Sequence, residues 1–86
     1  MNISIDISYY PLSDDFVPPI LEFISRLNQH TEIVVVTNGL STQVFGSYDD
    51  VMRIVTTEIR TSCELPHSVF VLKIVNSDRQ HYHGNK

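Results

Sequence analysis

Residues 33–44 have the sequence Ile-Val-Val-Val-Thr-Asn-Gly-Leu-Ser-Thr-Gln-Val, an apolar run followed by a polar turn and the start of another strand. Asn38-Gly39 is a strong signal for a tight hairpin, because both central residues of a type I′ turn need positive φ angles. Residues 33–36 are all apolar, so we expect cover on both faces of their strand. The segment predicts a β-hairpin in the middle of the chain.

Strands are also predicted at the two ends of the domain. Residues 2–10 alternate between isoleucines and polar side chains, a period of two that is typical of a strand with one face toward a core. Residues 68–75 form the last strand, with Phe70, Leu72 and Ile74 on one face. We therefore expect four strands in all.

Two amphipathic helices connect these strands. In the first, apolar residues recur at helical spacing from Phe16 to about Asn28, and Pro18 and Pro19 fit its first turn. Ser47 with Asp50 three residues later resembles a capping box for the second helix, which residues 63–66 end. Three residues before the first helix are candidate caps for it, namely Ser13, Asp14 and Asp15.

The predicted order β-α-β-β-α-β is that of an α+β, ferredoxin-like domain. Right-handed crossovers give an antiparallel sheet with strand order 4-1-3-2 and both helices on one face. The domain covers residues 1–76, and the polar tail 77–86 is expected to fray.

The sheet face opposite the helices is expected to mix valines with polar groups. Asp6 of the first strand and Lys73 of the last should pair across these neighbouring strands. A surface of this kind usually meets a partner, and a second copy is the simplest one. We therefore expect a homodimer or homotetramer formed through this open face, which carries Ser4, Asp6, Ser8, Tyr10, Val69, Val71, Lys73 and Val75.

Composition excludes several classes of function. The chain has 86 residues, enough for one domain, and its net charge of −4 and scattered basic residues argue against nucleic-acid binding. Cys63 is the only cysteine, so no intrachain disulfide can form and a reducing compartment fits best. No signal-like or membrane-spanning run is visible. We expect a cytoplasmic protein with no membrane partner.

Catalytic and metal-binding patterns are weak. Cys63 lies beside Glu64, whose charge disfavours a reactive thiolate, so we expect no enzyme, although a pairing of Cys63 with His67 is conceivable. His81 and His83 lie in the polar tail, which offers no ordered backbone for a metal. The sequence therefore predicts no metal and no cofactor.

Polar side chains gather around the Asn-Gly turn more densely than a hairpin needs. One interpretation is that they satisfy the turn backbone, as Asn, Ser and Thr often do. The other is that they recognise a small polar ligand, with residues of the first strand contributing to the site. The candidate ligand-binding residues are Asp6, Ser8, Tyr10, Thr37, Asn38, Ser41, Thr42 and Gln43.

Three segments carry a resemblance to a known family. Residues 7–12 (Ile-Ser-Tyr-Tyr-Pro-Leu), Pro18-Pro19-Ile20 and residues 37–46 (Thr-Asn-Gly-Leu-Ser-Thr-Gln-Val-Phe-Gly) resemble the YkoF-like thiamine/hydroxymethylpyrimidine-binding proteins. The resemblance implies a ferredoxin-like fold, oligomers whose sheets pack together, and binding of thiamine or its pyrimidine moiety. A thiamine-binding member has two such domains in one chain, so a dimer of the present chain would restore the pair.

The residue types suit such a ligand. Hydroxyl and amide side chains match the ring nitrogens and amino group of an aminopyrimidine. Asp6 with Tyr9 or Tyr10 would suit a cationic thiazolium. We expect a non-enzymatic protein that binds thiamine, hydroxymethylpyrimidine or a related heteroaromatic. The alternative is an oligomeric regulatory or assembly module without a small ligand, and a weaker third is an enzyme with its site at the dimer junction.

Overall fold

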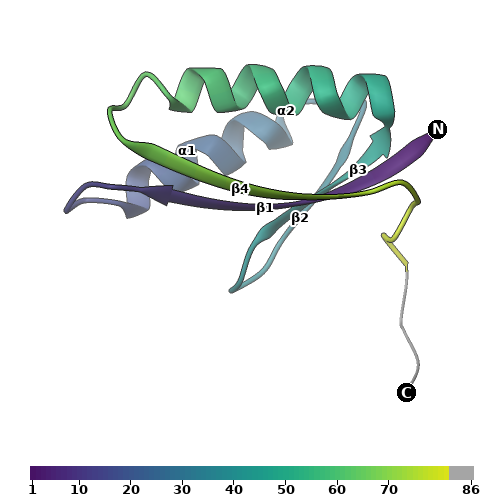
Figure 1. Ribbon diagram of the computed structural model, residues 1–86, viewed down its shortest axis with the longest axis horizontal. Coiled ribbons are helices and arrows are strands. Elements are labelled where there is room, and N and C mark those ends of the chain that lie inside the picture. Colours follow the sequence, from purple (N-terminus) through teal and green to yellow (C-terminus); the bar gives the residue numbers. More distant parts are fainter. Residues whose placement is uncertain (82–86) are drawn as a thin grey trace.

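The computed structural model describes residues 1–81, so residues 82–86, with His83 and the end of the predicted tail, lie outside the described part. Four strands form one antiparallel sheet in the order β2-β3-β1-β4, which is the predicted order 4-1-3-2 counted from the other edge. Both helices lie on the same side of this sheet (Figure 1). The elements are β1 (Asn2–Pro11), α1 (Val17–Asn28), β2 (Val34–Thr37), β3 (Thr42–Ser47), α2 (Tyr48–Ser62) and β4 (Ser68–Val75).

The hydrophobic core lies between the sheet and the helix layer. The alternation in β1 directs its isoleucines into this core and its polar residues to the other face. The helices contribute the apolar stripes that their spacing predicts. Removal of these side chains from water is the main driving force for packing the two layers. The most deeply buried core residues are Ile3, Ile5, Ile7, Phe23, Leu27, Val44, Val51, Ile54 and Val55.

The strand register confirms the predicted open face. Asp6 lies opposite Gln43 of β3 and opposite Lys73 of β4, so all three share the face away from the helices. Within residues 1–81 no ion pair joins Asp6 to Lys73; the Asp6 carboxylate instead accepts a hydrogen bond from the Ser41 hydroxyl. The neighbouring placement was predicted correctly, whereas the hydrogen-bond partner was not.

The expected type I′ turn is wrong. Thr37 pairs with Thr42, so the loop spans residues 38–41, and neither Asn38 nor Gly39 has a positive φ. The Asn38 side chain organises the loop: its Oδ1 accepts from the backbone N–H groups of Leu40 (2.8 Å) and Ser41 (3.1 Å). An asparagine that forms such a turn with its own side chain removes the need for left-handed backbone.

The expected caps of α1 are also wrong, whereas the cap of α2 is confirmed. A capping side chain accepts from the N–H groups of the second and third helical residues, which here are Pro18 and Pro19 and have no N–H. Accordingly, α1 follows Phe16 without a side-chain cap. In α2, by contrast, Ser47 Oγ accepts from the backbone N–H of Asp50 at 3.3 Å.

Cover on both faces of β2 was expected and is not found. β2 is an edge strand, and Val34 and Val36 are 42% and 40% exposed on the open face. Val35, on the other face, packs against the core. An all-apolar run is therefore compatible with an edge strand whose outer face is uncovered within the single chain.

The start of the C-terminal tail is attached to the sheet. Ser4 Oγ donates to the carbonyl of Ser77 (2.7 Å) and accepts from the backbone N–H of Arg79 (2.8 Å). The expectation of fraying therefore fails for residues 77–79, because Ser4 provides both a donor and an acceptor at the sheet surface.

Candidate functional site

A cavity lies where β1 extends beyond the end of β3. The last pair between these strands is Ile7 with Thr42, whereas Ser8 and the residues after it pair with β4 only. The space left beside β1 is bordered by the β2–β3 hairpin and by α1, and the resulting open-sided cavity has a volume of about 200 Å³. We call it the hairpin cavity; its lining residues are Ile7, Ser8, Tyr9, Tyr10, Ile20, Phe23, Ile24 and residues 37–42.

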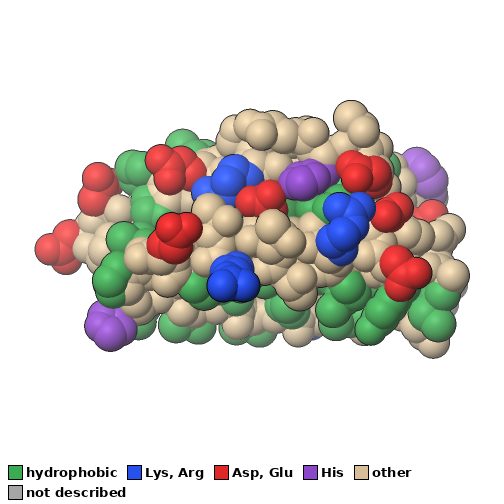
Figure 2. Space-filling model, turned by 90° about the horizontal axis from the view of Figure 1, so that it is seen from above, with side chains coloured by type: hydrophobic (Ala, Val, Ile, Leu, Met, Phe, Trp, Pro, Cys, Tyr) green, Lys and Arg blue, Asp and Glu red, His purple; other side chains and the backbone are tan. Residues whose placement is uncertain are grey.

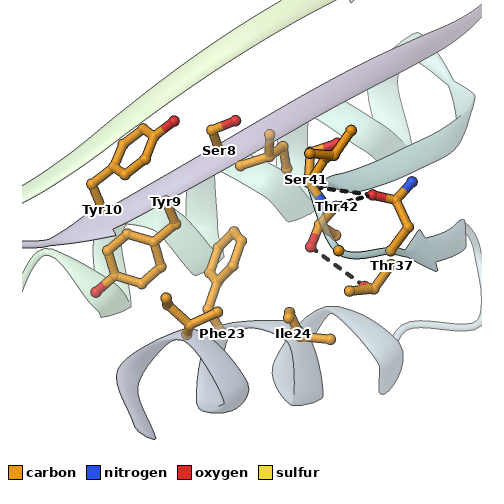
Figure 3. A pocket seen from close by; sticks show the side chains of 13 residues that line it. Ser8, Tyr9, Tyr10, Phe23, Ile24, Thr37, Ser41 and Thr42 are labelled. Carbon is orange, nitrogen blue, oxygen red and sulfur yellow. Dashed lines mark hydrogen bonds between the residues drawn. The ribbon is translucent and has the colours of Figure 1, made fainter. Parts of the chain in front are cut away.

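One wall of the hairpin cavity is aromatic and aliphatic. Tyr9 and Phe23 meet edge to face with their ring centroids 5.6 Å apart, and Tyr9 stacks on Phe70 at 4.2 Å. The Tyr9 hydroxyl lies 3.2 Å from Ser68 Oγ, which fixes the ring at its far end. Figure 3 shows Tyr9, Phe23 and Ile24 between β1 and α1. This arrangement provides a preformed apolar surface suited to a flat ring.

The opposite rim of the hairpin cavity is polar. The hydroxyl oxygens of Thr37 and Thr42 lie 3.4 Å apart, and Thr42 is only 6% exposed (Figure 3). Asn38 uses its carbonyl oxygen within the loop, which leaves its Nδ2 as a donor. Satisfying the turn backbone thus accounts for the oxygen of Asn38, while the two threonine hydroxyls and the amide nitrogen keep capacity for another partner.

Asp6 contacts the β2–β3 hairpin from the open face of the sheet. Ser41 lines the hairpin cavity, and its hydroxyl donates to the Asp6 carboxylate on the open face. Asp6 and Gln43 do not line this cavity but a separate open-face hollow, together with Phe45 and Lys73. The predicted site residues therefore divide between two places, with Asp6 linking them.

Ser8 and Tyr10 border the hairpin cavity from β1. Their register partners on β4 are Val71 and Val69, which belong to the open face. In Figure 3 the side chains of Ser8 and Tyr10 project from the opposite side of β1 to Tyr9. Their hydroxyls therefore point away from the aromatic wall.

Sequence reasoning missed the α1 side of the cavity. Ile20, Phe23 and Ile24 line it, and Phe23 is also a core residue, only 1% exposed. The signal available was the apolar stripe of α1, which has the same pattern whether the side chains meet the sheet or a cavity. Tyr9 was considered as an aromatic face but was not among the candidate residues.

The charged network between the helices lies outside the hairpin cavity. Arg26 Nε of α1 and His30 Nε2, two residues after the end of α1, each lie 2.8 Å from an oxygen of Glu58 on α2. Burial works to raise the pKa of Glu58, but hydrogen bonds from His30 and Arg26 outweigh it and hold that pKa below its usual value. The network joins the helices and has a structural role.

The helix-bearing face has no concentrated charge of one sign. Figure 2 shows acidic and basic side chains interspersed over it. In residues 1–81 no cluster of three or more His, Cys, Asp or Glu side chains could hold a metal ion. Neither described helix is long and apolar enough to cross a membrane.

Comparisons with known proteins identify the fold. No protein-family model matches the sequence, and no curated protein matches it significantly. Among solved structures, a protein of Streptococcus pneumoniae is 25% identical with a TM-score of 0.82, covering 91% of this chain and 89% of that chain.

Two further solved structures are similar at lower identity. A Thermotoga maritima protein with a proposed role in thiamine biosynthesis or salvage is 18% identical with a TM-score of 0.79, covering 90% of this chain and 85% of that chain. A domain of unknown function from Bacillus cereus is 12% identical with a TM-score of 0.70, covering 91% and 78%. The chain thus shares its ferredoxin-like fold, over nearly its whole length, with these three proteins.

Proposed function

We propose that this chain is a non-enzymatic binding protein for a small heteroaromatic, either thiamine or its hydroxymethylpyrimidine moiety, and that it acts as a cytoplasmic homo-oligomer. The observation that carries the proposal is the hairpin cavity, with Tyr9 and Phe23 on one side and Thr37, Asn38 and Thr42 on the other. Small-molecule sites typically combine such an apolar wall with a few convergent polar groups.

The chemistry of the cavity suits an aminopyrimidine. A flat ring would lie against Tyr9 and Ile24, which are only partly buried. Its nitrogens would accept from a threonine hydroxyl and from Asn38 Nδ2, and its amino group would donate to a threonine oxygen. The volume of about 200 Å³ is small for a ligand site and favours one ring inside. The thiazolium of thiamine would then lie outside the cavity, where Tyr10 and Asp6 are available to a cation.

The family resemblance also supports the hairpin cavity as the ligand site. Parts of all three of its segments, namely residues 7–10, Ile20 and residues 37–42, line the hairpin cavity. The fold shared with the Thermotoga maritima protein agrees with this assignment. Convergence of the resembling segments on one cavity is what a shared ligand would require.

Binding without chemistry fits the lining of the cavity. Its residues include no carboxylate, imidazole or thiol side chain, the groups that most often act as general acid, general base or nucleophile. We therefore favour retention of an unchanged ligand over turnover.

The open face supports association of copies. Val34, Val36, Val71 and Val75 are 38% to 49% exposed there, so packing two open faces would bury apolar surface from both. These same residues favour the alternative function, an oligomeric regulatory or assembly module in which the hairpin serves the interface.

Calorimetric titration with hydroxymethylpyrimidine and thiamine tests the proposal. Thr42→Val keeps the side-chain shape and removes a cavity hydroxyl, so Kd should rise about 2- to 13-fold, the equivalent of one hydrogen bond of roughly 0.5–1.5 kcal/mol. Gln43→Ala, on the open face, is the matched control for the pyrimidine and should bind hydroxymethylpyrimidine like the wild type.

Thermal unfolding gives an independent readout. A ligand at a hundred times its Kd stabilises the native state by about 2.7 kcal/mol. Stabilisation by either compound supports the proposal. No response to either compound, in a protein that remains oligomeric, would reject it in favour of the assembly module.

A further inference from the structure

We propose that the open-face hollow binds a small organic anion, a carboxylate carried on a compact apolar body. The hollow has a volume of about 340 Å³ and lies on the sheet face away from the helices, apart from the hairpin cavity. It would take an acid, whereas the hairpin cavity takes a neutral or cationic heteroaromatic. The inference therefore goes beyond the proposed function and does not depend on it.

Two neighbouring rows of side chains form the floor of the hollow. Each row crosses β3, β1 and β4 in the observed register. The polar row consists of Gln43, Asp6 and Lys73, and the second row, which is apolar at both ends, consists of Phe45, Ser4 and Val75. Residues that follow each other on one face of a strand are about 7 Å apart. A ligand with an acidic end and an apolar end can therefore lie across both rows.

The described tail encloses the second row. Figure 1 shows the chain after β4 turning to the side of the sheet away from the helices. On that side Ser4 Oγ is bonded to the backbone of Ser77 and Arg79. Both Ser4 and Phe45 are only 6% exposed, whereas Val75 is 38% exposed and offers apolar surface to a ligand. This end of the hollow suits a compact apolar body.

The lining of the hollow carries an excess of one positive charge. Two basic side chains, Lys73 and Arg79, line it together with one acidic side chain, Asp6. Within residues 1–81 the Lys73 ammonium has no ion-pair or hydrogen-bond partner. Arg79 is held beside the hollow, because its Nε donates to Ser77 Oγ at 2.9 Å. A monoanion would balance the excess charge, whereas a doubly charged phosphate would exceed it.

Asp6 is directed away from the place where an acid would bind. Its carboxylate accepts a hydrogen bond from the Ser41 hydroxyl. Ser41 precedes β3 and lies beyond Gln43 on the side away from the second row, so this bond draws the Asp6 carboxylate away from that row. A ligand carboxylate placed between Lys73 and Arg79 would then accept a charge-assisted hydrogen bond from the Lys73 ammonium.

Titration with benzoate, followed by amide chemical shifts, tests the site on protein that contains no other ligand. We expect saturable shifts centred on Gln43, Lys73 and Val75. Benzamide has the same ring without the charge, so at the same ionic strength it should bind about tenfold more weakly or worse. Equal affinity for benzoate and benzamide, shifts centred on the hairpin cavity, or no saturable shift at tens of millimolar benzoate would overturn the proposal.

Charge-removing variants give a second test. Lys73→Gln keeps a flexible polar side chain and should weaken benzoate binding by about threefold or more, the size of one exposed ion pair, with an unchanged circular dichroism spectrum. Arg60→Gln removes the same charge from an exposed position on α2 and is the matched control, so it should bind benzoate like the wild type. Equal affinity of wild type and Lys73→Gln, or an equal loss in both variants, would overturn the proposal.

These titrations separate the two sites. They contain no hydroxymethylpyrimidine, so failure of the proposal for the hairpin cavity would leave their expected outcome unchanged. Conversely, Lys73→Gln should bind hydroxymethylpyrimidine like the wild type, because Lys73 lines the open-face hollow alone.

Discussion

Removing the Glu58 carboxylate should destabilise the fold far more than removing an exposed carboxylate. Glu58 is 8% exposed and holds both Arg26 and His30, whose side chains are 26% and 27% exposed. In Glu58→Ala, Arg26 of α1 and His30, which follows α1, lose their anionic partner while remaining partly removed from water. The hydrogen bonds that Arg26 Nη2 donates to the backbone carbonyl of residue 58 (3.2 Å) and to Ser62 Oγ would remain, so the loss is that of the carboxylate alone.

The burial values set the size of the effect. Removing one partner of a fully buried pair costs about 3–5 kcal/mol, and an exposed pair contributes at most about 1 kcal/mol. Because Arg26 and His30 are about a quarter exposed, we expect Glu58→Ala to lower the free energy of unfolding by roughly 2–3 kcal/mol. For a domain of this size that corresponds to a fall in Tm on the order of 10–20 °C.

Urea and thermal unfolding at one fixed protein concentration measure this effect, because association also changes apparent stability. Glu32→Ala is the control: its partner Arg53 lies 3.2 Å away, but the two side chains are 43% and 55% exposed. We expect that variant to unfold almost like the wild type. Equal and small losses of unfolding free energy in Glu58→Ala and Glu32→Ala would refute the stabilising role of the Glu58 carboxylate.

Three further predictions concern pH, capping and the tail. The pKa of Glu58 is lowered in the folded state, so the ionised carboxylate stabilises the fold fully above the usual value of 4.5, and this stabilisation is lost as pH falls through the lowered pKa. The difference in unfolding free energy between wild type and Glu58→Gln should therefore shrink in acid. A difference that does not vary with pH would contradict this. Ser47→Ala should lower the free energy of unfolding by about 1 kcal/mol through loss of the α2 cap, whereas Ser13→Ala, which caps no helix, should change it little in the same urea titration. Ser4→Ala should speed hydrogen exchange of the Arg79 amide without changing exchange in β1; unchanged exchange at Arg79 would show that Ser4 does not hold the tail.

Periodicity was sufficient for the strands that pack one face on the core. In β1 the alternation of isoleucines with Ser4, Asp6 and Ser8 predicted both the strand and its faces. The same reasoning gave the bounds of β4, and together they placed Asp6 opposite Lys73. These patterns are informative because burial on a single face leaves a clear period of two.

Local hydrogen bonding was less predictable. Asn38 formed a turn through its side chain, so the expected left-handed backbone was unnecessary. Pro18 and Pro19 removed the donors that a cap before α1 would have bound. In both cases the backbone N–H groups available for hydrogen bonding decided the local structure, and the usual preference of Asn-Gly or of a capping residue did not.

The candidate site was predictable on its hairpin side and at Ser8 and Tyr10 of β1, but not on its α1 side. Polar residues in excess of what a turn needs pointed to Thr37, Asn38 and Thr42. The cavity itself depends on the pairing of Ile7 with Thr42, which leaves the end of β1 without β3 beside it. That register is set by packing across the whole sheet. Because the cavity forms beside α1, Phe23 lines it as well as packing in the core, and the helical spacing of Phe23 does not reveal this.

Amide chemical-shift mapping during titration with hydroxymethylpyrimidine tests most directly whether the hairpin cavity is the ligand site. We expect saturable shifts concentrated at Tyr9, Phe23 and the 37–42 loop, with residues around Glu58 unaffected. Shifts confined to the open-face hollow around Gln43 and Lys73, or no shifts at millimolar compound, would contradict it.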